Sequence, residues 1–203
     1  MLGIQKIDRR AKYRESTRQE ILGAAWDVAR TQGLAAVTLR EVATRVGMQA
    51  PSLYSHFTSK NAIYDAMFGQ AWQEYREIAE ALALPESPRA ALRLIGHAFL
   101  DFATTDAARY QLMNQRTLAG FQPTPASYAP ALAVWDLLVA TLRTLGIDDP
   151  VAADLFSALL GGLADSQLAN DLGGNRWTRL LDRAIDMYAN EMGLPGAPPK
   201  ELA

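Results

Sequence analysis

The side chains best suited to chemistry gather in a short polar stretch in the first third of the chain. Gln49, Ser52 and Tyr54 carry hydrogen-bonding groups, and His56 and Lys60 follow closely. Such groups bind base edges or anionic oxygens. We find no nucleophile paired with a base, no phosphate-binding glycine loop and no metal-ligand cluster. The chain also contains no Cys, which excludes thiol catalysis, disulfides and zinc fingers. The pattern indicates binding rather than covalent catalysis.

A strong charge asymmetry surrounds this stretch. The chain of 203 residues has a formal net charge of −2, yet residues 1–60 carry ten Lys or Arg and only five Asp or Glu. Residues 61–203 carry ten basic and seventeen acidic side chains. A basic segment on an acidic body predicts contact between that segment and a polyanion, and a separate role for the body. A solvated basic tail is the alternative, because charge alone does not distinguish the two.

The composition is that of a folded globular chain of one or two domains. Hydrophobic residues make up 49% of the sequence and the net charge is low, which argues against disorder. No run of about 18 apolar residues occurs, so we expect no membrane span. Residues 1–18 lack the apolar segment of a secretory signal. The expected location is therefore the cytoplasm.

Hydrophobic periodicity predicts an all-α chain of about nine helices and no strands. A capping box at Ser16 or Thr17 predicts the start of the first helix, and Gly33 predicts its end. Thr38 begins a second helix with another capping box, and Gly47 ends it after about two and a half turns.

A short third helix follows this glycine-containing turn. Pro51 fits only the first turn of a helix, so the third helix is expected from Gln49 or Ala50 to about Phe57. Two short helices joined in this way within a basic segment match the helix-turn-helix motif, whose second helix enters the major groove of DNA. Ser59 can cap a fourth helix. The remaining helices are expected at residues 60–83, 89–104, 106–118, 127–145, 150–171 and 175–192.

With these elements in place, the sequence resembles a known family. Residues 15–75 resemble the DNA-binding domain of the tetracycline-repressor (TetR) family of bacterial transcription regulators. The motifs that carry the resemblance are Gln19–Ala25, the Gly33 break, Thr38–Ala43, Val46-Gly47, Leu53–Phe57 and Ser59-Lys60. The resemblance implies a three-helix N-terminal helix-turn-helix domain, followed by a helical C-terminal bundle that dimerises and binds a small molecule.

By this resemblance, residues at the second helix and beyond it contact DNA. The expected contacts are Thr38, Gln49, Ala50, Pro51, Ser52, Tyr54, Ser55, His56 and Lys60. Gln49 stands where many members have Ser or Thr, and a Gln can bond adenine through both of its polar groups. The alternatives are that Tyr54 is a core aromatic, that His56 bonds a turn and that Lys60 is merely solvated.

The sequence divides into four expected segments. These are a basic flexible arm at 1–14, the helix-turn-helix domain at 15–75, a ligand-binding and dimerisation domain at 76–192 and a disordered tail at 193–203. The arm carries Arg9, Arg10, Lys12 and Arg14. Basic arms can enter the minor groove, and a solubilising tail is the alternative.

The resemblance implies that the chain is a homodimer, in which the last two helices of each copy form the interface. The residues expected at the dimer interface are Leu155, Leu159, Gly162, Leu163, Leu181, Ile185 and Tyr188. Packing within one chain is the alternative, although a single helix-turn-helix binds too weakly to find its site alone.

Large apolar side chains between these regions are candidates for a small-molecule pocket. They are Phe99, Phe102, Tyr110, Met113, Phe121, Tyr128 and Trp135. An ordinary bundle core is the alternative for most of them. His97 has no second His or Cys beside it in the sequence, so we expect a core or rim histidine, no metal site and no cofactor.

The resemblance implies a ligand-responsive repressor that binds a palindromic double-stranded DNA operator as a homodimer and is released by a small-molecule effector. An activator stays open, because operator position decides the outcome. Two alternatives belong to other classes: a helical small-molecule enzyme, and a protein-interaction module without DNA binding. The missing catalytic constellation argues against the first, and the motif residues Thr38, Tyr54, His56 and Lys60 argue against the second.

Overall fold

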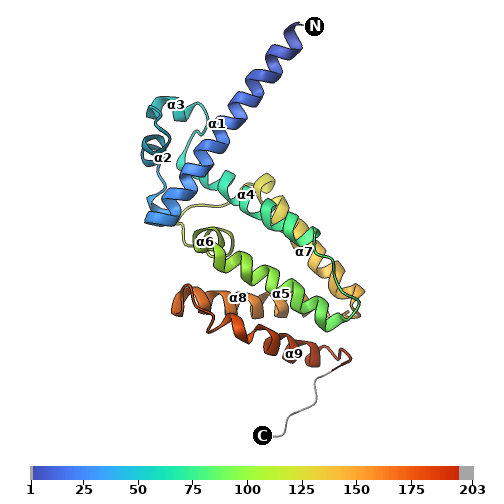
Figure 1. Cartoon of the computed structure of the whole chain (residues 1–203). Coiled ribbons are helices and arrows are strands. Elements are labelled where there is room, and N and C mark those ends of the chain that lie inside the picture. Colours follow the sequence, from blue (N-terminus) through green and yellow to red (C-terminus); the bar gives the residue numbers. More distant parts are fainter. Residues whose placement is uncertain (1, 197–203) are drawn as a thin grey trace. The chain divides into compact units, whose positions relative to one another are not determined.

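The computed structural model describes the backbone of residues 2–196 and the side chains of residues 9–196. Within these residues every regular element is a helix, as the sequence predicts (Figure 1). The α-helices are α1 (Leu2–Gln32), α2 (Leu39–Val46), α3 (Ala50–Tyr54), α4 (Lys60–Glu80), α5 (Pro88–Thr105), α6 (Ala107–Asn114), α7 (Pro125–Thr144), α8 (Ala152–Asn170) and α9 (Leu181–Glu191). Two 3-10 helices, η1 (Leu34–Ala36) and η2 (Thr178–Leu180), precede α2 and α9.

The longest helix begins much earlier than the sequence predicts. α1 starts at Leu2 instead of near Ser16, so the segment 1–14, expected as a flexible arm, is helical from its second residue. The hydroxyl of Thr17 donates to the carbonyl oxygen of Tyr13 at 3.0 Å, a bond that is made inside a helix rather than at its start. The expected capping box therefore does not begin the helix.

Tertiary contacts divide the chain into two units. Unit 1 comprises residues 1–72 and 108–129, and unit 2 comprises residues 73–107 and 130–203. The sequence predicts a boundary near residue 75, but it does not predict that 108–129 belong with the first unit. α4 and α7 each contribute residues to both units.

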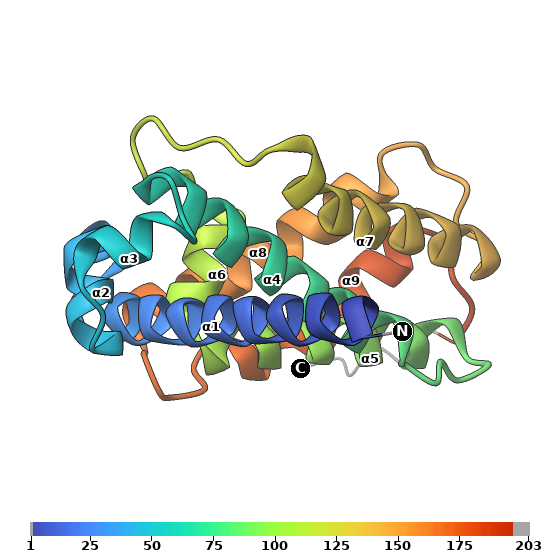
Figure 2. The same ribbon diagram turned by 90° about the horizontal axis from the view of Figure 1, so that it is seen from above.

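The core of unit 1 is built on the second half of α1. Ile21, Ala25 and Val28 share one face of this helix and are fully buried. α2 packs against α1 and α3 packs against α2, both beside this half of α1 (Figure 2). Leu53 and Phe57 add to the same core. Their burial fixes which side of α3 faces solvent.

Residues 108–129 join unit 1 through a polar contact with α4. Asp65 accepts hydrogen bonds from the backbone N–H of Thr124 and from the hydroxyl of Ser127, each at 2.7 Å. These bonds hold the start of α7. A Cβ atom added to Gly69 would lie 3.3 Å from the Cβ of Ser127, so α4 and α7 approach closely at this point.

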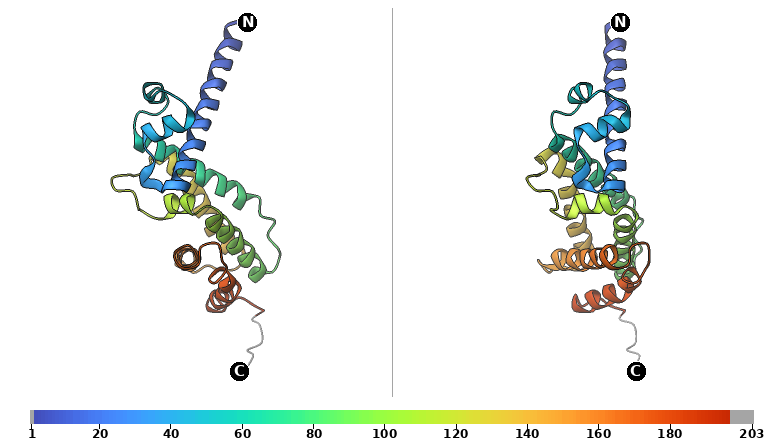
Figure 3. Two further views of the ribbon diagram at one scale, coloured as in Figure 1. Left: turned by 60° about the vertical axis from the view of Figure 1, so that its left-hand side comes forward. Right: turned by 90° about the vertical axis from the view of Figure 1, so that its left-hand side faces the viewer.

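Unit 2 packs α5 against α8 and α9, and the last two helices run side by side (Figure 3). Its buried apolar side chains include Leu92, Leu100, Phe156, Leu160, Leu181 and Ile185. Gly96 of α5 lies close to this cluster, since a Cβ there would be 3.0 Å from a methyl group of Leu181. The small residue lets α9 pack tightly against α5.

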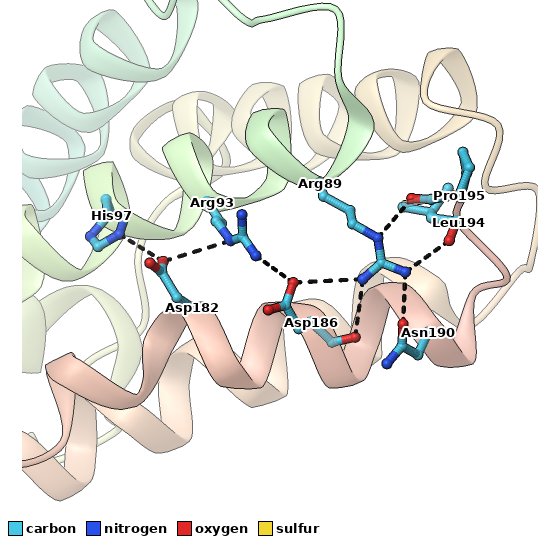
Figure 4. A network of polar contacts seen from close by, with 8 residues as sticks. All are labelled: Arg89, Arg93, His97, Asp182, Asp186, Asn190, Leu194 and Pro195. Atoms are coloured by element: carbon cyan, nitrogen blue, oxygen red, sulfur yellow. Dashed lines mark hydrogen bonds and ion pairs between the residues drawn. The ribbon is translucent and has the colours of Figure 1, made fainter. Parts of the chain in front are cut away.

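A row of polar contacts also joins α5 to α9 (Figure 4). Three side chains of α5 face three of α9, each set spaced four residues apart: Arg89, Arg93 and His97 against Asn190, Asp186 and Asp182. Buried Arg89 also donates to the carbonyl oxygens of Leu194 and Pro195, each at 2.8 Å. The first residues of the segment expected as a disordered tail are therefore held in place, and 197–203 lie outside the described residues.

α7 is an exception to the expectation that no segment is long and apolar enough to span a membrane. α7 is 20 residues long and apolar enough, by length and composition, to cross one. Core helices of globular bundles pass the same test, and α7 carries Asp136 and Arg143. Composition alone is therefore weak support for a membrane role.

Candidate nucleic-acid interface

The motif expected over residues 38–57 is present in unit 1. Thr38 caps α2, since its hydroxyl accepts a hydrogen bond from the backbone N–H of Glu41 at 3.1 Å. Gly47 ends α2 in the left-handed conformation, with φ 73° and ψ 24°, which glycine adopts without steric cost. The chain thus turns tightly from α2 into α3.

α3 has one buried side and one exposed side. It ends at Tyr54, a little before the expected end near Phe57. Leu53 and Phe57 are buried and anchor the segment. The exposed residues are Gln49, Pro51, Ser52, Tyr54 and Ser55, whereas Ala50 is half-buried. Tyr54 is 52% exposed and so is not a core aromatic.

Two arginines of α1 hold the C-terminal end of α3. Arg14 donates to the carbonyl oxygen of Ser55 at 3.2 Å, and Arg18 donates to that of His56 at 2.7 Å. The Arg18 guanidinium also lies over the ring of Phe57, 4.3 Å from its centre. This role is not among the expectations from the sequence. The available signal was the four-residue spacing of the two arginines, which places them on one face of a helix.

His56 and Lys60 differ in accessibility. His56 is half-buried, and its Nδ1 is shielded from solvent without a hydrogen-bond partner in the described part of the chain. Any contact of this ring with an external acceptor or donor must therefore use Nε2. Lys60 is exposed at the start of α4, with its Nζ 5.2 Å from the centre of the Tyr64 ring. Ser59 caps α4 as expected, accepting the N–H of Ala62 at 3.1 Å.

Two parts of the chain match models of one protein family. Residues 21–67 match the family model described as bacterial regulatory proteins, tetR family. Residues 92–188 match the model described as tetracyclin repressor-like, C-terminal domain. The chain belongs to the TetR family. Members of this family are transcription regulators that bind DNA, and not enzymes.

Two relatives resemble parts of this TetR-family chain. The transcriptional activator FasR of Mycolicibacterium smegmatis is 33% identical over 101 residues, which cover 49% of this chain and 46% of FasR. The transcriptional repressor KstR2 of Mycobacterium tuberculosis is 34% identical over 83 residues, which cover 39% of this chain and 42% of KstR2. The chain thus spans less than half the length of either relative.

Solved structures share the fold of this TetR-family chain over most of its length. The regulatory protein SCO4313 has a TM-score of 0.73 and 22% identity, covering 89% of this chain and 98% of its own. The multidrug binding protein EbrR, complexed with imidazole, has a TM-score of 0.62 and 22% identity, covering 91% of this chain and 98% of its own. At this level of identity the likeness shows the common fold alone.

The residues expected to line a pocket fall into separate groups, one of them in unit 2. Phe99 and Phe102 contact the ring of Tyr75, with centroids 5.8 Å and 5.0 Å from it. Burial raises the pKa of the Tyr75 hydroxyl above its ordinary value. Trp135, also in unit 2, is 37% exposed. Of the residues expected to line a pocket, unit 2 therefore contains Phe99, Phe102 and Trp135.

The other expected pocket residues lie in unit 1. Phe121 and Tyr128 pack on Phe68, with centroids 6.4 Å and 6.0 Å from it. Tyr110 and Met113 of α6 are buried. Tyr110 and Met113 thus lie in the core of unit 1, whereas Phe121 is half-buried and Tyr128 is 44% exposed.

The residues expected at a dimer interface differ in exposure between α8 and α9. Leu155 is 48% exposed, Gly162 is exposed, and Leu159 and Leu163 are half-buried. The three expected residues of α9, namely Leu181, Ile185 and Tyr188, are instead buried in unit 2. The Tyr188 hydroxyl donates to the carbonyl oxygen of Ala152 at 3.0 Å. A buried side chain offers no surface to a second chain, so we assign these three residues to the core.

His97 lies at the surface of unit 2, where its Nε2 is 3.0 Å from a carboxylate oxygen of Asp182. The described side chains include no group of three or more His, Cys, Asp or Glu that could hold a metal ion.

Proposed function

We propose that the chain is a dimeric transcription repressor that binds a palindromic operator through α3 and is released by a small-molecule effector. The observation that carries the proposal is the exposed polar side of α3, which Arg14 and Arg18 hold in place. It lies within residues 1–60, where basic side chains outnumber acidic ones. Gln49 and Ser52 offer hydrogen-bonding groups to base edges, and Tyr54 offers its hydroxyl to a phosphate.

A binding assay with DNA from upstream of the chain's own gene tests this proposal. The wild type is expected to bind with an affinity that weakens as salt rises, because phosphate contacts release counterions. The double variant Gln49→Ala with Tyr54→Ala is expected to lose roughly tenfold or more in affinity. Gln73→Ala, an exposed glutamine outside the motif, is the control. Salt-insensitive binding by the wild type, or unchanged binding by the double variant, contradicts the proposal.

Exposed apolar surface on α8 supports dimerisation. Leu155 is 48% exposed and Val151, just before the helix, is 49% exposed. A second copy would cover this surface and place two recognition helices about 34–36 Å apart, on successive major grooves. Leu155→Arg should therefore sediment as a monomer at concentrations where the wild type is a dimer. Leu172→Arg, at another exposed leucine, should leave the dimer intact. A monomeric wild type would overturn this part of the proposal.

Aromatic side chains of unit 2 support an apolar effector. Phe99 and Phe102 are half-buried and Trp135 is partly exposed, and apolar side chains dominate small-molecule sites. The structural neighbour EbrR is described as multidrug binding. A thermal-shift screen of apolar compounds should find one that raises the melting temperature and weakens operator binding, since an effector must favour the state that does not bind DNA. Ligands that stabilise the chain but leave DNA binding unchanged would contradict release.

The direction of regulation is the remaining part of the proposal. A dimer that covers a promoter excludes polymerase, and one relative, KstR2, is named a repressor. A reporter gene behind the chain's own upstream region should therefore be expressed less when the chain is present. Higher expression would instead assign activation, the role named for the relative FasR.

A further inference from the structure

The first half of α1 carries an exposed basic segment, which we define as residues 9–14. Arg9, Arg10, Lys12 and Arg14 all lie at the surface, and the segment contains no acidic side chain. The helix continues without a break from this segment into the core of unit 1. In Figures 1 and 3 this half of α1 extends past α2 and α3.

The basic segment begins beside the recognition helix. Arg14, its last residue, donates to the carbonyl oxygen of Ser55, which follows the exposed Tyr54 directly. Arg10 is four residues earlier, so it lies one turn farther along the same face of α1. Arg9 is about 100° from Arg10 around the helix and Lys12 lies nearly opposite Arg14, so the cations surround α1 over about 7–8 Å of its axis instead of forming one row.

We propose that the basic segment is a second DNA-binding surface, which contacts the phosphates that flank the bases contacted by α3. The proposal rests on the proposed function, because it needs α3 to be docked on DNA. Its occupant follows from charge: DNA carries a negative charge every 1.7 Å or so along its axis.

The helical state of the segment decides which part of the DNA it contacts. A helix with its side chains is about 10–12 Å across, whereas the minor groove of B-DNA is about 6 Å wide. A helical segment therefore cannot enter the minor groove as an extended arm does. It contacts the backbone instead, and such contacts add affinity without sequence preference.

The test uses the full chain with Arg9→Gln, Arg10→Gln and Lys12→Gln combined, leaving Arg14 to hold α3. Operator affinity is measured at several salt concentrations on two duplexes, one with long flanks and one trimmed to the two half-sites. On the long duplex the variant is expected to bind roughly tenfold more weakly. Its logarithmic salt dependence should be less steep by up to about 0.9 for each phosphate that the variant no longer neutralises. On the trimmed duplex wild type and variant should bind alike.

A matched control removes the same charge elsewhere. Arg143→Gln, Arg179→Gln and Arg183→Gln replace three exposed arginines of unit 2 and should leave affinity on both duplexes near that of the wild type. An equal fall in affinity in this control would show a general charge effect and overturn the proposal. Circular dichroism of each variant checks that helix content is retained.

Three further results would overturn the proposal while leaving the proposed function intact. The first is equal affinity and salt dependence of wild type and variant on the long duplex. The second is an equal fall in affinity on both duplexes, which would exclude flanking DNA as the partner. The third is a change in the variant's sedimentation, which would assign the segment to contact with another copy of the chain. Absence of salt-sensitive operator binding by the wild type would instead refute the proposed function itself.

Discussion

Arg18 of α1 donates to the carbonyl oxygen of His56 at 2.7 Å, across 38 positions of the sequence. α3 ends without a glycine, at Ser55 in the right-handed conformation. The carbonyl groups of Ser52 and Leu53 accept backbone N–H groups of the following residues, whereas those of Ser55 and His56, just after the helix, accept from arginine side chains of α1. The orientation of the recognition helix is therefore set from α1 as well as from the core beneath it.

Arg18→Ala should weaken both the fold of unit 1 and DNA binding. It removes a hydrogen bond from a charged donor and a guanidinium contact with Phe57, together about 1–3 kcal/mol in the free energy of unfolding. Urea unfolding followed by circular dichroism measures this change, and operator affinity should fall even where the variant is fully folded. Arg18→Lys keeps the charge but not the planar group, so it should recover only part of both. Full recovery by lysine would mean that charge alone matters.

Asp65→Ala should destabilise unit 1 by about 1–3 kcal/mol, because the N–H of Thr124 and the hydroxyl of Ser127 lose their acceptor. Amide hydrogen exchange should also be faster at the start of α7 than in the wild type. Asp27→Ala, at an exposed acid of α1, is the control and should leave exchange in α7 unchanged. Unaltered exchange in Asp65→Ala would show that the side chain does not hold this helix end.

Arg89→Ala should destabilise unit 2 by about 3 kcal/mol or more. Arg89 is 5% exposed and donates to the carbonyl oxygen of buried Leu194, which would then lack this donor. Arg93→Ala removes a more exposed partner of Asp186 and should cost about 1 kcal/mol. Chemical unfolding compares the two, and equal destabilisation would contradict the special role of Arg89.

The free energy of unfolding should fall in alkaline solution because of the buried hydroxyl of Tyr188. Burial, assisted by the charge of Asp149, raises the pKa of Tyr188 to about 12. An unfolded tyrosine loses its proton near pH 10, so above that pH the unfolded state binds fewer protons than the folded one. Stability is fully present below about pH 10 and falls as pH rises toward 12, by about 1.4 kcal/mol per pH unit for this one group.

The variant Tyr188→Phe tests this dependence. It should be less stable at neutral pH, because the carbonyl of Ala152 loses its donor. Its urea-unfolding free energy should then decline less steeply than that of the wild type between pH 10 and 11. Tyr13→Phe, at a 77% exposed tyrosine, should follow the wild-type slope. If the Tyr188→Phe slope also matches the wild type, Tyr188 does not cause the decline.

The sequence predicts the elements of the candidate interface well because their causes are local. Thr38 and Ser59 each cap a helix by accepting a backbone N–H three residues later, and Gly47 ends α2 by its own conformational freedom. Such effects act within one helical turn, so residue type and spacing are enough to predict them.

Features that depend on distant residues were not predictable in this way. The bond between Asp65 and Thr124 joins positions 59 apart, and nothing in either neighbourhood indicates it. Leu181 and Ile185 show an apolar face in the sequence, but the pattern does not tell whether α5 or a second chain covers that face; in the structure they are fully buried. Gln167, a polar residue 1% exposed within an apolar helix, accepts the backbone N–H of Trp177 at 2.9 Å, ten residues away.

The close approach of Gly69 to Ser127 has a consequence for how the family diverges. An added methyl group at position 69 would lie 3.3 Å from the Cβ of Ser127, so the start of α7 would have to shift by a few tenths of an ångström. Homologues that keep Asp65 and its bond to the start of α7 should therefore keep a glycine at position 69. Homologues with a larger residue there should have lost the acid at position 65 as well. Positions 65 and 69 should thus covary in an alignment, because both depend on how closely α4 approaches the start of α7.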